Sequence, residues 1–141
     1  MPHSASMTIS APGVPGVTAA SGPCDGGYSI SNRLKNSAVA PVGAIEKVLE
    51  KAGWSADEVE LWEVNEAFAC VAMFAMRDLG IPHDKINVNG GGTALGHPIG
   101  ASGTRIIVTL LNALKQQGKT RGVASLCIGG GEATAVAVEL V

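Results

Sequence analysis

The chain has 141 residues, of which 46% are hydrophobic and 16% are charged, and ten basic against twelve acidic side chains give a formal charge of −2. This length suits one domain with a sizeable core, and apolar content drawn mainly from Ala, Val, Ile and Leu favours an α/β protein whose strands are covered on both faces. The near-balanced charge excludes a global electrostatic attraction to nucleic acid or to a membrane surface, so neither is an expected partner.

The first half of the chain predicts one helix and one strand after a segment without periodicity. Residues 1–36 are rich in Pro, Gly and Ser and are expected to be irregular. Apolar residues at helical spacing predict a helix over 41–52, with Pro41 at its first position, where the missing N–H is harmless. "SADE" at 55–58 is typical of a capping box, and "ELWEV" at 60–64 predicts a strand.

The second half of the chain predicts two buried helices and further strands. The helix over 65–80 is apolar nearly all round, "KINVN" at 85–89 is a brief extended run, and a second helix closes at Gly118. "GVASLCI" at 122–128 and "ATAVAVELV" at 133–141 predict a final antiparallel pair. The resulting β-α-β-α-β-β order favours a layered α/β fold, in which chemistry collects at strand ends and helix starts.

Cysteine usage and hydropathy indicate the compartment. Cys24, Cys70 and Cys127 form no CxxC pair, so neither a metal site nor a disulfide framework is expected, and a reducing interior follows. The longest apolar stretch, Ala67–Met76, is too short to span a bilayer. The first ten residues lack a basic start followed by an apolar block, so no secretory signal is expected. We therefore expect a cytoplasmic, soluble domain.

The most unusual stretch is "NGGGTALGHPIGASG" at 89–103, which holds six glycines around one histidine. Ordering glycine is costly, so such a cluster indicates a sharp turn or a close approach. The small residues at 100–103 predict a helix start packed too tightly for any bulk. A phosphate-binding loop is an alternative, although the stretch matches neither common glycine-rich nucleotide motif and places no lysine on a phosphate.

His97 is the first candidate for chemistry. It precedes Pro98, which holds its backbone extended, and the flanking glycines leave its ring open to an incoming group. A neutral imidazole there accepts a proton from a thiol or donates one to a carbonyl oxygen. The alternative is a histidine that is simply hydrogen-bonded within the loop.

Cys127 and Asn65 are further candidates. Cys127 ends an apolar strand just before three glycines, so its thiol lies beside unhindered backbone N–H groups, which together suit proton transfer and oxyanion binding. The alternative is a buried cysteine acting as a small hydrophobe. Asn65 opens a predicted helix, where capping is the simplest role, and Glu66 suits the helix dipole. Cys70 is expected in the core, and no base is placed to activate Cys24.

Three segments together resemble the thiolase family: "NEAFA" at 65–69, "GGTALGHPIGASG" at 91–103 and "CIGGG" at 127–131. Thiolases are CoA-dependent acetyl-CoA acetyltransferases and β-ketoacyl-CoA thiolases. The resemblance covers residues 37–141, with a weak echo in "AASGPCDGG" at 19–27. It implies a thiolase-like C-terminal domain over 37–141, one layered α/β half with a mixed sheet.

The resemblance also implies roles for particular residues. His97 would activate a nucleophilic cysteine and help to polarise the acyl carbonyl, and Asn65 would hold a water in the same oxyanion site. Cys127 would take or return the proton at the α-carbon of the acyl thioester. The backbone N–H of Gly129 would contribute to a second oxyanion site.

Ala67 and Phe68 would line the pantetheine path of a CoA thioester, which is the implied substrate, with no permanently bound cofactor. The acyl-accepting cysteine of thiolases belongs to their N-terminal half, and no segment here matches its surroundings; Cys24 is not at an equivalent place. The implied partners are therefore acyl-CoA or CoA, and either further copies of the chain or a complementary N-terminal thiolase half. A non-catalytic thiolase-fold remnant or CoA-binding subunit is the alternative, and an unrelated phosphate-binding module ranks last.

Overall fold

The computed structural model describes residues 8–9, 17–23 and 30–140. These residues form strands and helices, with two short 3₁₀ turns at Ala56–Glu58 and His83–Lys85. In chain order the elements are β1 (Thr8–Ile9), β2 (Val17–Pro23), α1 (Ile30–Ala52), β3 (Leu61–Val64), α2 (Ala69–Leu79), α3 (Gly92–Leu95), α4 (Ser102–Gln117), β4 (Arg121–Gly129) and β5 (Glu132–Glu139).

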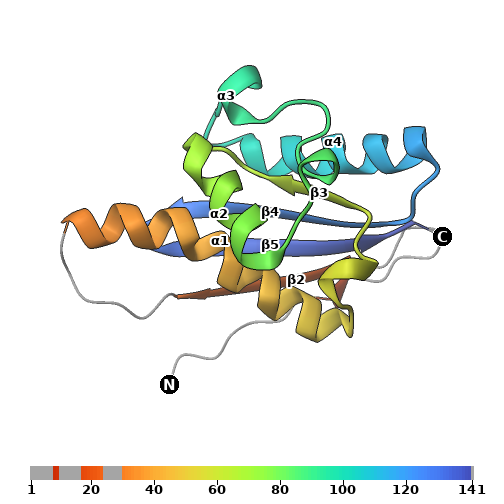
Figure 1. Cartoon of the computed structure of the whole chain (residues 1–141), viewed down its shortest axis with the longest axis horizontal. Coiled ribbons are helices and arrows are strands. Elements are labelled where there is room, and N and C mark those ends of the chain that lie inside the picture. The colour runs from red at the N-terminus through yellow and green to blue at the C-terminus, as the bar shows by residue number, and fades with distance from the viewer. Residues whose placement is uncertain (1–7, 10–16, 24–29, 141) are drawn as a thin grey trace.

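The strands form one mixed sheet in the order β1-β2-β5-β4-β3 (Figure 1). All neighbours are antiparallel except β3 and β4, which run parallel with Val64 opposite Ser125. The carboxyl ends of β3 and β4 therefore lie at the same edge of the sheet, and the chain between them carries α2, α3 and α4.

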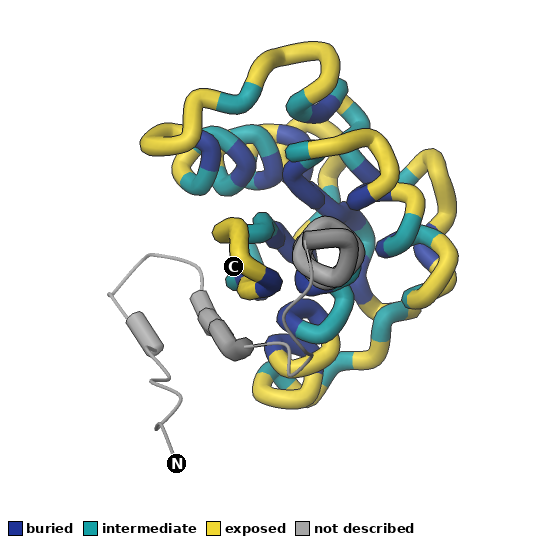
Figure 2. Tube along the Cα trace, turned by 90° about the vertical axis from the view of Figure 1, so that its left-hand side faces the viewer, coloured by how far each residue is buried: buried dark blue, intermediate teal, exposed yellow. Residues whose placement is uncertain are grey.

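Helices cover both faces of the sheet. α1 and α2 pack together on one face, and the core there includes Ile45 and Val48 of α1 and Trp62 of β3. α4 covers the other face through Ile106, Leu110 and related apolar side chains. Figure 2 shows the resulting helix–sheet–helix layers from one end of the molecule. The predicted layered α/β class is confirmed.

Three other sequence predictions are confirmed. α4 ends at Gly118, which adopts the left-handed conformation (φ 63°) and donates its N–H to Leu114. β4 and β5 form the antiparallel pair, with Cys127 opposite Ala133 and an irregularity between Cys127 and Gly129. Ser55 and Glu58 form the predicted capping box at the first 3₁₀ turn.

The expectation for residues 1–36 is wrong in part. Residues 17–23 form β2, and α1 begins at Ile30, so that Pro41 lies inside the helix. The small residues of β2 give little hydrophobic signal, and the strand forms by pairing along its whole length with β5. Pro41 lacks the N–H that would donate a hydrogen bond within α1. Pro41 is buried and α1 packs on the sheet, and this packing offsets the missing hydrogen bond. Cys24 lies outside the described residues.

Two predictions between β3 and α4 are also wrong. α2 begins at Ala69, with Phe68 as N-cap, so residues 65–68 are not helical. The run at 85–89 adds no strand to the sheet: a 3₁₀ turn precedes a single bridge between Ile86 and Trp62. Both short segments are instead held by side-chain hydrogen bonds, which a hydrophobic pattern does not report.

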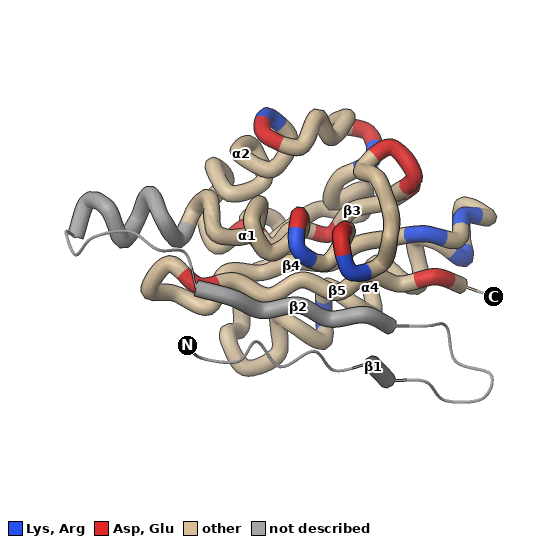
Figure 3. Tube along the Cα trace, turned by 90° about the horizontal axis from the view of Figure 1, so that it is seen from below, with Lys and Arg blue, Asp and Glu red and all other residues tan. Residues whose placement is uncertain are grey.

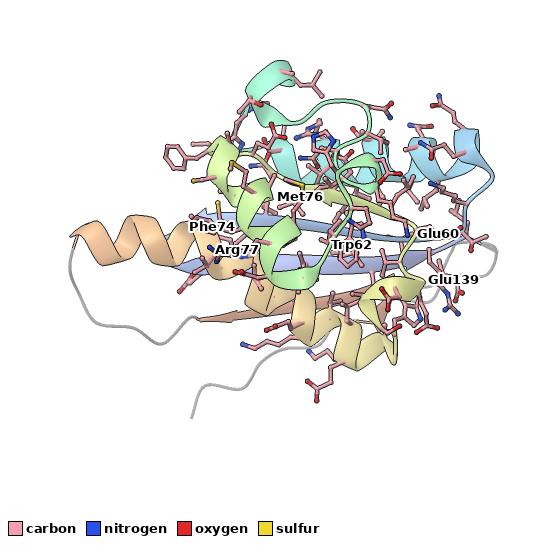
Figure 4. The ribbon with its side chains drawn as sticks, in the orientation of Figure 1. Glu60, Trp62, Phe74, Met76, Arg77 and Glu139 are labelled. Carbon is pink, nitrogen blue, oxygen red and sulfur yellow. The ribbon has the colours of Figure 1, made fainter. Side chains whose placement is uncertain are left out.

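Acidic and basic residues are mixed over the part of the chain that the structure describes (Figure 3). Figure 3 shows Lys and Arg interspersed with Asp and Glu. Arg121 bonds Glu139 at 2.7 Å and Glu58 at 3.0 Å at the end of the sheet where β3 begins and β5 ends (Figure 4 labels Glu60 and Glu139 there). The opposite end, where β3 stops at Val64, carries the candidate site. Across the described residues, no helix is long and apolar enough to cross a membrane.

Candidate functional site

Asn65 is placed by the parallel pairing of β3 and β4. Its backbone N–H donates to the carbonyl oxygen of Ser125 at 2.9 Å, which continues the ladder one residue beyond β3. The residue is fully buried, as are Glu63 and Ser125 beside it. A buried amide side chain needs hydrogen-bond partners, so the predicted N-cap role is replaced by a role inside the protein.

Asn65 belongs to a buried polar network. Arg105 of α4 donates through Nη2 to Asn65 Oδ1 at 3.3 Å and through Nη1 to Glu63 Oε2 at 3.2 Å. Burial raises the pKa of Glu63 to about 7. The positive charge of Arg105 lowers this pKa and the negative charge of Glu66 raises it, but burial has the largest effect. The guanidinium thus links β3 to the first turns of α4.

His97 lies between α3 and α4 and is half-buried. Its Nε2 and Nδ1 lie 3.4 Å and 3.5 Å from Asn65 Nδ2. Its Nδ1 also lies 2.6 Å from the hydroxyl of Ser102, a fully buried residue at the start of α4. The structure therefore brings together two of the predicted site residues, which are 32 positions apart in the chain.

Glu66 fastens the glycine-rich loop to the end of β3. Its carboxylate accepts hydrogen bonds from Asn87 Nδ2 at 2.9 Å and from the backbone N–H of Thr93 at 3.1 Å, and it also bonds the Thr93 hydroxyl. Burial alone would raise the pKa of Glu66, but these hydrogen bonds hold it below its ordinary value. Glu66 therefore serves the loop and not the helix dipole.

The prediction of a tightly packed helix start at 100–103 is wrong for its glycines. A Cβ added at Gly100 or Gly103 would meet nothing within 4 Å. The close approaches lie earlier in the loop: a Cβ at Gly91 would lie 2.2 Å from Glu66 Cδ, and one at Gly92 would lie 2.8 Å from the Glu66 carbonyl oxygen. Glycine is needed where the loop passes over residue 66.

Cys127 lies on β4, two positions beyond Ser125, and is half-buried. Because Val64 lies opposite Ser125 in the parallel pair, Cys127 lies beyond the end of β3, at the same end of the sheet as Asn65. Burial raises the pKa of its thiol, so the protonated form prevails at neutral pH. Among the described residues, no hydrogen bond joins this thiol to His97 or Asn65. Gly129 is exposed and adopts a positive φ of 90° at the turn into β5.

Ala67 and Phe68 lie in the short segment between β3 and α2. The Ala67 N–H donates to the carbonyl oxygen of Asn65 at 3.1 Å, and the Phe68 side chain is 56% exposed. Exposed apolar side chains also lie in α3, in the loop before α4 and at the end of β4: Leu95, Ile99 and Ile128.

Residues 28–140 match the family described as the C-terminal domain of thiolase. The chain belongs to the thiolase family. It is 54% identical over 101 residues to the cytosolic acetyl-CoA acetyltransferase of Mus musculus, a match that covers 72% of this chain and 25% of that protein. An acetyl-CoA acetyltransferase of Chromobacterium violaceum is equally similar, with 26% of its length covered.

Solved thiolase structures share the fold. The acetyl-CoA acetyltransferase of Bacillus anthracis superposes with a TM-score of 0.80 and 38% identity over 91% of this chain and 31% of that one. A human mitochondrial 3-ketoacyl-CoA thiolase in complex with CoA gives the same TM-score and identity over 90% and 30%. The chain therefore spans about a quarter of the length of the curated relatives it matches.

Several residues of the site network are not predicted by the sequence reasoning. Arg105, Glu63 and Ser102 are absent from the candidate set, although each makes a polar contact to His97 or Asn65 or to one of their partners. Two features of the sequence could have identified them: Arg105 lies beside the apolar stripe of α4, and Glu63 lies within an otherwise apolar strand. A charge in such a place is expected to be paired.

Proposed function

We propose that this thiolase-family chain provides the proton-transfer part of an acyltransferase site that acts on 3-ketoacyl-CoA thioesters. The observation that carries the proposal is the approach of Asn65 Nδ2 to the His97 ring, at the edge of the sheet to which β4 brings Cys127. Support also comes from the names of the relatives, which are acetyl-CoA acetyltransferases, and from a structural neighbour bound to CoA.

Thiolytic cleavage breaks the bond between C2 and C3 of the substrate. C3 becomes a thioester of a nucleophilic cysteine, whose proton His97 accepts. The electron pair stays on C2, to which Cys127 gives its proton. CoA then takes the acyl group, and the proton of its thiol restores Cys127, while His97 returns its own proton to the leaving cysteine. The protonated thiol favoured by burial of Cys127 suits the first of its two tasks.

The remaining proposed roles concern binding. Asn65 holds a water that, with His97, stabilises the oxyanion of the acyl thioester, and the Gly129 N–H serves the second oxyanion site. Ala67 and Phe68 line the path of the pantetheine arm. The exposed ring of Phe68 supports this role, since a pantetheine chain offers apolar methylene and methyl groups to cover it.

The nucleophilic cysteine is proposed to come from a complementary N-terminal thiolase half, and the complete site from an oligomer. The exposed apolar side chains Phe68, Leu95, Ile99 and Ile128 support a covering partner at this end. The solution mass of the chain, alone and with that half, tests this. A monomer that never associates would contradict it.

Reconstitution tests the activity. The chain is mixed with the complementary N-terminal part of a relative, and thiolysis of acetoacetyl-CoA is followed. We expect the mixture to be active. His97→Ala or Cys127→Ser should lower the rate of thiolysis at least about a hundredfold, because proton transfer contributes about 10²–10⁴-fold. Cys70→Ser should change the rate little. Cys70 is exposed on α2, so the prediction of a core position is wrong, and its substitution controls for the loss of a thiol. No turnover with both parts folded and associated would overturn the proposal and favour a non-catalytic CoA-binding subunit.

A cytoplasmic location is proposed as well. It is supported by the cytosolic relatives in mouse and rat. A human mitochondrial thiolase among the structural neighbours makes the mitochondrion the competing location. Fractionation of cells from the source organism, with an antibody against this chain, distinguishes the two.

A further inference from the structure

The last residue of β3 has backbone groups that no strand can satisfy. β3 is an edge strand, with β4 as its one neighbour in the sheet. Asn65 directs its N–H towards β4, to the carbonyl oxygen of Ser125. Successive residues of a strand direct their peptide groups to opposite sides, so Val64 directs its N–H and C=O away from β4. Val64 is buried, and buried peptide groups need partners within the protein.

The side chain of Asn87 supplies these partners. The Val64 N–H donates to Asn87 Oδ1 at 2.9 Å, and Asn87 Nδ2 donates to the Val64 carbonyl oxygen at 2.9 Å. This arrangement fixes the orientation of the amide, because an N–H group only donates and a carbonyl oxygen only accepts. The backbone N–H of Asn87 also donates to the carbonyl oxygen of Trp62 at 2.8 Å. Residue 87 thus takes the place of a further strand beyond the end of β3.

The same amide connects the end of β3 to the glycine-rich loop. The second proton of Asn87 Nδ2 is donated to Glu66 Oε1 at 2.9 Å. Glu66 also accepts the backbone N–H of Thr93, which lies four positions before His97. Through its side chain, Asn87 therefore contacts the residue before Asn65 and the residue after it. Its contact with Glu66 extends this link to the loop that carries His97.

The backbone of Asn87 adopts a conformation that suits glycine better. Its φ is 47°, and among the described residues Asn87 is the one non-glycine residue with a positive φ. Asparagine tolerates this region better than most residues, but glycine adopts it more readily. Glycine at position 87 would satisfy the backbone and would provide no amide. Strained residues persist where their surroundings over-determine them, and the three side-chain hydrogen bonds do so here.

We infer that Asn87 is a positioning residue of the acyltransferase site: its side-chain amide fixes the backbone on both sides of Asn65 and, through Glu66, fixes the distance from Asn65 to His97. The inference rests on the proposed function, which gives chemical roles to Asn65 and His97. Asn87 itself acts through the backbone and through Glu66. Its contribution is the placement of an oxyanion-binding amide against a base, which must hold to within about 1 Å for efficient catalysis.

Nuclear magnetic resonance of the chain by itself tests the placement. The Asn65 Nδ2 atom lies 3.4 Å from His97 Nε2, so a nuclear Overhauser effect is expected between the Asn65 NH₂ protons and the His97 ring protons. We expect this effect to be lost in Asn87→Ala and in Asn87→Gly. Asn112→Ala is the matched control, because the Asn112 amide bonds only the backbone of α4, at Val108, and the effect should persist there. An undiminished effect in the folded Asn87 variants would overturn the inference.

A conservative variant separates the bonds of the amide. Asn87→Asp keeps an acceptor for the Val64 N–H but removes the donors to the Val64 carbonyl oxygen and to Glu66. Hydrogen exchange of the Val64 N–H should therefore quicken in Asn87→Ala and Asn87→Gly and stay slow in Asn87→Asp. The Asn65–His97 effect should weaken in all three. Should the first two variants unfold the chain, Asn87→Asp decides alone, and an undiminished effect in it contradicts the inference.

Kinetics of the reconstituted enzyme distinguish positioning from a merely structural role. Per folded and associated chain, Asn87→Ala and Asn87→Gly should lower kcat for thiolysis of acetoacetyl-CoA equally, by about tenfold or more. The KM for CoA should change little, because the proposed contacts of CoA do not include Asn87. Glycine relieves the positive φ, so urea unfolding should show Asn87→Gly to be the more stable of the two. Losses of kcat that follow this order of stability would overturn the positioning role.

The resonance measurements need no turnover. If the Asn65–His97 effect depends on Asn87 as expected but the reconstitution is silent, the positioning role stands and the proposed function is refuted. If the reconstituted enzyme is active and Asn87→Gly leaves both kcat and the Asn65–His97 effect unchanged, the proposed function stands and the positioning role is refuted.

Discussion

Substitution of Gly91 by alanine tests whether Glu66 fixes the glycine-rich loop. The new Cβ would lie 2.2 Å from Glu66 Cδ and 2.3 Å from Oε1. Gly91 itself has φ −108° and ψ −165°, which alanine adopts without strain. The overlap is thus relieved only by moving the carboxylate, which breaks its bonds to Asn87 and Thr93. Bonds to a charged group contribute about 1.5–3 kcal/mol each, and the released carboxylate regains water, so we expect a loss of about 2–4 kcal/mol.

Urea unfolding of the full chain measures this loss, and a double-mutant cycle isolates its cause. In a Glu66→Ala background, Gly91→Ala is expected to cost less than about 1 kcal/mol, because the atoms it would meet are gone. Gly103→Ala is the matched control, since a Cβ there meets nothing within 4 Å. An equal cost of Gly91→Ala with and without Glu66, or equal destabilisation by Gly103→Ala, would show that Glu66 does not fix the loop.

Three further outcomes are expected. Burial raises the pKa of Glu63 from 4.5 to about 7, so the folded chain keeps a proton that the unfolded chain loses in that window. Stability should therefore fall as pH rises from 5 to 7.5, by up to about 3 kcal/mol, and urea unfolding of Glu63→Gln should lack that decline. Iodoacetamide at neutral pH should alkylate the exposed Cys70 well before Cys127, because burial raises the pKa of the Cys127 thiol. Peptide-resolved mass spectrometry measures the order, and the reverse order would contradict this expectation. Gly122→Ala, whose Cβ would lie 2.8 Å from Leu110 Cδ1, should cost about 1–3 kcal/mol in thermal unfolding, whereas Gly43→Ala, which meets nothing within 4 Å, should not destabilise.

The elements that follow from hydrophobic spacing are predicted well by the sequence. β3, α4 and the β4–β5 pair each bury a regular apolar pattern, and Gly118 stops α4 as expected. β2 is missed because a strand of Val, Thr, Ala, Ser, Gly and Pro has little hydrophobic signal and depends on its neighbour. Pro41 misplaces the start of α1, because packing on the sheet outweighs a local rule.

For the site, the sequence identifies the chemically unusual residues but not what holds them. His97 and Asn65 stand out through their surroundings in the sequence, and the structure brings them into contact. Glu66, Ser102 and Arg105 look locally like a dipole partner, a small residue and a surface charge. The contacts of Glu66 and Arg105 join segments 21 to 42 positions apart, as between Glu66 and Asn87 or between Arg105 and Glu63, whereas Ser102 contacts His97 five positions before it. A local pattern can indicate that a charge within an apolar surface is paired, as for Arg105, but it does not identify the distant partner.

The position of the site follows from the single parallel pairing in the sheet. Since β3 and β4 are neighbours and run in the same direction, the chain that leaves β3 at Asn65 must return to the opposite end of the sheet before β4 begins. α4 makes that return, so its N-terminus necessarily lies at the end of the sheet where β3 stops (Figure 1). The residues just before and inside its first turn, His97, Ser102 and Arg105, are thereby brought to Asn65. If β3 were antiparallel to β4, α4 would not have to begin at this end of the sheet, so the contacts of α4 with Asn65 and Glu63 depend on the parallel pairing.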